Sequence, residues 1–80
     1  MLKRYNDNLN VCGNIIKEAR ENKNMTKVDL CKKLELHAVY IDRNQLYMLE
    51  HNQLLIKDFE LLAIAKILDI DLNKLKDLID

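Results

Sequence analysis

Apolar residues recur at intervals of three and four positions along most of this 80-residue chain. That spacing places them on one face of an α-helix, whereas strict alternation would indicate a half-buried strand. Polar runs and capping residues divide the pattern into five segments. We therefore expect five short helices: one from about Leu9 to Asn22, one starting at Thr26, one opening at Asp42, one beginning after Lys57 and one capped by Asp71.

Local signals mark the ends of these helices. Thr26 and Asp29 are close to a capping box, in which each side chain accepts a hydrogen bond from the other residue's backbone N–H. Asp42 is a favourable N-cap for the third helix, and Asn52 tolerates the left-handed conformation that follows a helix. Residues 36–41 are β-branched and aromatic in part, so we expect an extended connector there.

The fourth segment is the most apolar. Between residues 59 and 68 its apolar side chains surround the helix almost completely, which is typical of a central, buried helix. One glycine and no proline are too few turn residues for a sandwich or a barrel. We therefore predict an all-α fold, a compact five-helix bundle that forms one domain over residues 9–80, after a flexible polar segment at residues 1–8.

Charge gives little direct evidence for a nucleic-acid partner. The chain carries 13 basic and 13 acidic residues, so its formal net charge is zero. Residues 1–50 nevertheless hold the basic excess, and residues 51–80 hold the acidic excess. Any face that binds a polyanion is therefore expected within the first fifty residues.

The remaining chemistry excludes several classes. No segment approaches the ~20 apolar residues of a membrane span, and the N-terminus lacks the apolar run of a signal peptide. We therefore expect a cytoplasmic protein in which Cys12 and Cys31 are free thiols. Their spacing with His37 and His51 lacks the close ligand pairs of a structural zinc site. With no glycine-rich phosphate loop or nucleophile elbow either, we expect no enzyme activity, cofactor or metal.

Three stretches carry a family resemblance. Residues 13–34, GNIIKEARENKNMTKVDLCKKL, resemble the opening of Xre/Cro phage-repressor-like helix-turn-helix domains, where IRxxRxxxxLTQxxLAxxL covers the first two helices. Residues 46–50, LYMLE, look like the family's ISxIE on the recognition helix. Residues 58–70, DFELLAIAKILDI, look like its closing xxExLxxIAKALGV. The turn before the third helix is longer than usual and lacks the usual glycine, which is similar to one subgroup of the family.

The resemblance implies that the third helix enters the major groove of double-stranded DNA. Arg43 and Asn44 would then reach base edges, because Arg pairs with guanine and Asn with adenine through two hydrogen bonds each. Lys27 would contact phosphate beside the start of the second helix. The other candidate contacts are Gln45 at phosphate, Tyr47 and Met48 at the groove wall, and His51 and Lys57 at the backbone. Each of these side chains is also compatible with a plain solvated role.

The resemblance further implies a structural ion pair. Arg20 and Glu50 match an Arg and a Glu that join the first helix to the third beneath the family's recognition surface. The alternative is two unrelated surface charges.

Two functions remain open. The first is a small transcription regulator, a repressor in the simplest case, that binds an operator as a homodimer. Its two copies would pack together through Leu75, Leu78 and Ile79. The same three side chains are equally compatible with an intramolecular core. The second is a protein-interaction module on the same fold, an antirepressor or adaptor, that binds a partner protein through Tyr47 and Met48. The basic first half of the chain favours DNA, and the zero net charge favours a protein partner.

Overall fold

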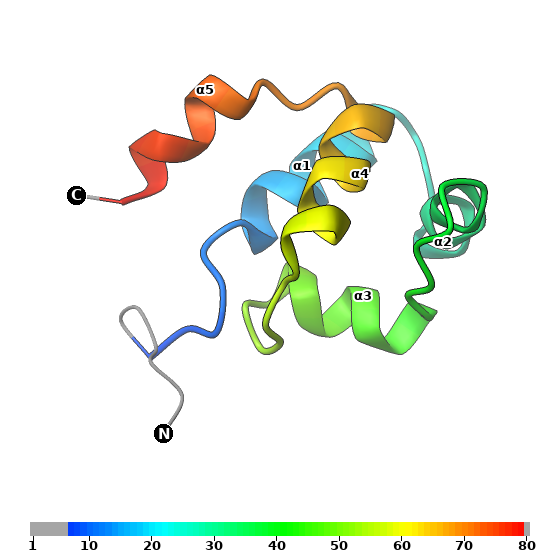
Figure 1. Cartoon of the computed structure of the whole chain (residues 1–80), viewed down its shortest axis with the longest axis horizontal. Coiled ribbons are helices and arrows are strands. Elements are labelled where there is room, and N and C mark those ends of the chain that lie inside the picture. The colour runs from blue at the N-terminus through cyan, green and yellow to red at the C-terminus, as the bar shows by residue number, and fades with distance from the viewer. Residues whose placement is uncertain (1–6, 80) are drawn as a thin grey trace.

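The computed structural model describes residues 7–79 and confirms the predicted all-α fold (Figure 1). The elements are α1 (Gly13–Asn22), α2 (Lys27–Glu35), α3 (Arg43–Glu50), α4 (Asp58–Leu68), α5 (Leu72–Leu75) and the 3-10 turn η1 (Lys76–Leu78). The flexible segment predicted for residues 1–8 falls mainly on residues 1–6, which lie outside the described residues.

The core forms where the first four helices converge. α1 packs against α3 and α4, and α2 packs against the same two helices. The largest fully buried side chains come from all four: Ile16, Leu30, Leu34, Leu46, Leu49 and Ile64. Burial of each such side chain contributes about 1.5–3 kcal/mol. This core fixes how α2 and α3 lie together, while α5 lies across α1 and α4 from them (Figure 1).

The predicted caps of α2, α3 and α5 are confirmed. The Thr26 hydroxyl accepts from the Asp29 N–H at 3.0 Å, and the Asp29 carboxylate accepts from the Thr26 N–H at 2.9 Å. The hydrogen bond from the Thr26 N–H to the carboxylate lowers the pKa of Asp29. Asp42 caps α3, and Asn52 follows α3 with a φ of 60°. Asp71 caps α5 through the Asn73 N–H.

The predicted start of the first helix is wrong, because α1 begins at Gly13 rather than Leu9. The Asn10 side chain accepts from the Cys12 N–H at 2.9 Å and donates to the carbonyls of Leu49 and Leu54 at 3.1 and 2.8 Å. These bonds hold the preceding segment against the loop that follows α3 and prevent it from continuing the helix.

Gly13 is required by the close approach of α1 to the end of α3. A Cβ at this position would lie 2.6 Å from the carbonyl oxygens of Leu49 and Glu50 and 2.5 Å from Asn52 Oδ1. The Gly13 N–H donates to that same Asn52 oxygen at 3.0 Å. The single glycine of the chain therefore lets the backbones of two helices meet, rather than serving a turn.

Two further expectations need correction. α4 is not buried all round, because Phe59 and Leu62 are more than half exposed. The connector is non-helical as predicted, but it turns at Ala38 (φ 59°) before it extends, and it buries Val39 and Ile41. A chain of this size has too little mass to cover both faces of α4.

The leucine stripe of α5 and η1 belongs partly to the core. Leu75 and Leu78 are half-buried against the main apolar cluster, so part of their surface serves this fold internally. Leu72 and Ile79 remain about half exposed.

Candidate nucleic-acid interface

The exposed side of α3 meets the start of α2. Lys27, Arg43, Asn44 and Tyr47 line one shallow depression at this junction. Lys27 is the first residue of α2, and the other three come from the first five residues of α3. The packing of Leu30 and Leu46 in the common core sets this arrangement. The fold therefore brings together four residues that the sequence had assigned to DNA.

The start of α3 is held by a capping box. Asp42 Oδ1 accepts from the Gln45 N–H at 2.7 Å, and Gln45 Oε1 accepts from the Asp42 N–H at 3.0 Å. This reciprocal pair fixes the first turn, where Arg43 and Asn44 are solvent-exposed. Both side chains are therefore presented from a rigid backbone, which favours specific contacts over loose ones.

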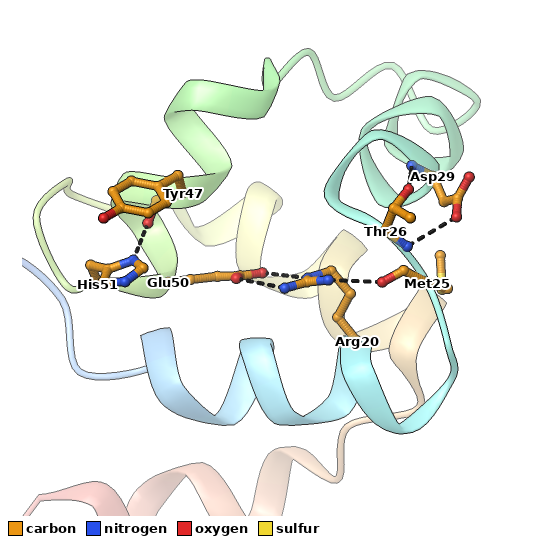
Figure 2. Close-up of polar contacts among 7 residues, drawn as sticks. All are labelled: Arg20, Met25, Thr26, Asp29, Tyr47, Glu50 and His51. Atoms are coloured by element: carbon orange, nitrogen blue, oxygen red, sulfur yellow. Dashed lines mark hydrogen bonds and ion pairs between the residues drawn. The ribbon is translucent and has the colours of Figure 1, made fainter.

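Tyr47 lies at the centre of the interface. The Lys27 ammonium lies 5.9 Å from the centroid of the Tyr47 ring, within the range of a cation–π interaction. The same ring stacks on His51 with a centroid distance of 4.1 Å (Figure 2). His51 Nδ1 lies 2.8 Å from the Tyr47 carbonyl oxygen, so Nδ1 carries a proton and donates. His51 is itself exposed and lies one turn beyond Tyr47.

Gln45 and Lys57 lie elsewhere. Both line a hollow on the other flank of α3, which we call the α3–α4 groove. The groove is bounded by Tyr40, Ile41, Gln45, Leu54, Leu55 and Glu60. Because the Gln45 carboxamide oxygen serves the capping box, its predicted phosphate contact has only the amide nitrogen to use. Met48 is half-buried and lines neither surface.

Arg20 and Glu50 form a buried ion pair beneath this surface. Arg20 Nε donates to Glu50 Oε2 at 2.8 Å and Arg20 Nη2 donates to Oε1 at 3.0 Å, as Figure 2 shows. Arg20 Nη1 also donates to the Met25 carbonyl at 2.8 Å. The hydrogen bonds to Glu50 raise the pKa of Arg20, so its guanidinium is charged at every accessible pH. The pair ties α1 and the α1–α2 turn to the end of α3.

The described residues offer little other chemistry. Within residues 7–79, no three His, Cys, Asp or Glu side chains are placed to hold a metal ion. Cys12 and Cys31 are buried free thiols, and this burial raises the pKa of both. None of the helices in this part of the chain is long and apolar enough to cross a membrane.

Sequence reasoning missed two features of this region. The Asp42-x-x-Gln45 spacing is itself a capping-box pattern, so the sequence does predict that Gln45 caps the third helix. Tyr40 is three-quarters exposed, whereas the sequence pattern predicts only that it belongs to a connector. No local signal identified it, because half of the groove's lining, Leu54, Leu55, Lys57 and Glu60, follows Tyr40 by fourteen residues or more.

A family model for helix-turn-helix domains matches residues 16–75. This span covers α2, α3 and α4 entirely, together with most of α1 and all of α5. No curated protein and no solved structure gives a significant match to the chain.

Proposed function

The chain belongs to the Xre/Cro-like helix-turn-helix family of DNA-binding transcription regulators, and on that premise we propose that α3 reads a specific duplex sequence in the major groove. The observation that carries this proposal is the convergence of Lys27, Arg43, Asn44 and Tyr47 on one exposed surface. The residue types suit the roles, because Arg and Asn recognise base edges and Lys neutralises phosphate.

The proposed binding geometry follows from the two helices. With α3 in the groove, Arg43 and Asn44 reach the bases from its first turn. Lys27 and the free backbone N–H groups at the start of α2 face the adjoining phosphates, where the positive end of the helix dipole adds to the lysine charge. Tyr47 packs against the groove wall, and His51 approaches the backbone one turn further along α3.

We propose that the regulatory effect is repression by a homodimer. Blocking a promoter by occupying an operator requires no surface beyond the DNA-binding unit, and a two-fold protein matches a palindromic operator. Leu72 and Ile79 keep apolar surface exposed that a second copy would cover. Sedimentation at micromolar concentration is expected to show a dimer, and a monomer at all concentrations would contradict this part of the proposal.

The decisive experiment is selection of bound duplexes from a random pool at low salt. We expect an enriched motif, and failure to enrich one would contradict specific recognition. Lys66, an exposed lysine near the end of α4, provides a matched control for charge. Lys66→Ala should retain the motif and the affinity, whereas Lys27→Ala should bind every duplex more weakly.

A protein-interaction role is the second candidate. The observation in its favour is Tyr47, an aromatic side chain about half exposed at the centre of a surface on a chain with no net charge. Tyr47→Ala separates the two candidates. A DNA-binding protein should lose little affinity for its motif, whereas an antirepressor or adaptor should lose its protein partner.

A further inference from the structure

The α3–α4 groove is a second surface, separate from the proposed DNA interface. Its hollow continues past Tyr40, Ile41 and Gln45 into an adjoining depression that Glu35 and Asp42 border. Ile41 and Leu54 provide apolar floor, and Tyr40 and Leu55 remain 75% and 46% exposed. Apolar and aromatic side chains left uncovered along a concave surface are typical of protein-binding sites.

The border of the groove is acidic. Glu35, Asp42 and Glu60 stand against the single ammonium of Lys57. Asp42 and Glu60 each use one carboxylate oxygen to accept a helix-capping hydrogen bond. Their second oxygens accept no hydrogen bond from residues 7–79. The surface thus combines apolar area with unpaired negative charge, and both need a complementary partner.

This charge separates the groove from the DNA interface. Phosphates would be repelled by the three carboxylates, so a DNA backbone that contacts Lys27 and Arg43 is not expected to extend over this flank of α3. Lys57 lies about 5.8 Å from the Phe59 ring centroid and is one cation among these acids. Its predicted backbone contact therefore has little support from its surroundings.

We propose that the α3–α4 groove binds a segment of a partner protein in which an apolar side chain is flanked by Lys or Arg. The apolar side chain would pack between Tyr40 and Leu55, and the basic residues would meet Glu35, Asp42 and Glu60. The groove borders the recognition helix from the side opposite Lys27. A protein held there would sit beside the bound operator, so that binding of DNA and of protein can occur together.

The test uses a random dodecapeptide library displayed on phage, with the full chain as bait. We expect enriched peptides that combine a large apolar residue with Lys or Arg. A labelled synthetic copy of the enriched peptide is then titrated against variants by fluorescence anisotropy. Tyr40→Ala should weaken binding about tenfold or more, since an exposed aromatic at the centre of a site is a typical hot spot. Glu35→Gln should weaken it and reduce its salt dependence.

Matched controls make the outcome decisive. Tyr47→Ala removes a comparable exposed tyrosine, and Glu18→Gln removes an exposed acid on α1; neither should change peptide affinity. Tyr40→Ala should leave DNA affinity unchanged, and circular dichroism should confirm that this exposed truncation preserves the fold. The proposal is overturned by the absence of a consensus, by an acidic consensus, by binding that depends on Tyr47, or by loss of DNA affinity in Tyr40→Ala.

Discussion

The Arg20–Glu50 pair makes a quantitative prediction about stability. The two side chains are 7% and 0% exposed, and the guanidinium makes three hydrogen bonds, two to Glu50 and one to the Met25 carbonyl. Arg20→Ala would therefore leave a carboxylate and a carbonyl oxygen without partners in the interior. Stranding one member of a buried pair costs about 3–5 kcal/mol. Since small domains have total stabilities of about 5–15 kcal/mol, this loss is a large fraction of the whole.

Glu50→Ala should cost a comparable amount, because it leaves the guanidinium with only the Met25 carbonyl. The double variant should lose less than the sum of the two single variants. Once one partner is absent, removing the other eliminates an unsatisfied charge rather than a contact. Urea unfolding followed by helical circular dichroism provides the four free energies of this cycle. We expect a coupling energy of about 1–3 kcal/mol.

The exposed pair of Lys23 and Asp69 provides the matched control. Its Nζ–Oδ2 distance of 2.7 Å is as short, but the side chains are 39% and 78% exposed. A cycle of Lys23→Ala and Asp69→Asn should show coupling below about 1 kcal/mol, and that coupling should fall in high salt. Asn is the suitable replacement because residue 69 has a φ of 56°. Additivity of the Arg20 and Glu50 effects within about 0.5 kcal/mol would refute the reasoning.

Three other perturbations test separate parts of the account. Lys27→Ala should lower the slope of log affinity against log salt by about one unit, as loss of one phosphate contact does, while Lys66→Ala leaves it unchanged. Gly13→Ala should destabilise by about 1–3 kcal/mol in thermal or urea unfolding; the gain in helix propensity, at most about 1 kcal/mol, cannot offset a Cβ placed 2.6 Å from two carbonyl oxygens. Because the pKa of Asp29 is lowered by its capping bonds, its stabilising effect is present above the ordinary Asp pKa of about 3.9 and is lost as pH falls through its folded value. The stability difference between wild type and Asp29→Asn should therefore shrink in acid.

The features predicted best from the sequence are those that depend on neighbours in the chain. Thr26 and Asp29 cap α2 as expected, and Asn52 adopts the left-handed conformation after α3, because both outcomes depend on residues within one turn. The inward positions Leu46 and Leu49 followed from helical spacing, and both are buried.

The features that failed depend on contacts between distant segments. The start of α1 is set by hydrogen bonds from Asn10 to carbonyls about forty residues away, and no local pattern encodes these bonds. Apolar side chains on every side of α4 indicated full burial of this helix. Whether Phe59 and Leu62 are buried, however, depends on how many other helices pack against α4.

The candidate site divides in the same way. Arg43, Asn44 and Tyr47 share one helix, so their relation was apparent from the sequence. The position of Lys27 beside Tyr47 depends on how α2 and α3 pack, and only the family resemblance suggested it. Gln45 and Lys57 line the α3–α4 groove instead. Gln45 is one residue beyond Asn44, a rotation of about 100° around α3, and Lys57 lies outside α3, directly before α4.

The central claim is that Arg43 and Asn44 read bases from the first turn of α3. The most direct measurement is a specificity profile: the affinities of wild type and Arg43→Ala for the selected duplex and for each single base-pair substitution of it. We predict that Arg43→Ala loses about 1–3 kcal/mol on the selected duplex and loses its preference at one guanine, while discrimination at the other positions is retained. An Arg43→Ala profile identical to that of the wild type in both affinity and base preference would contradict the account.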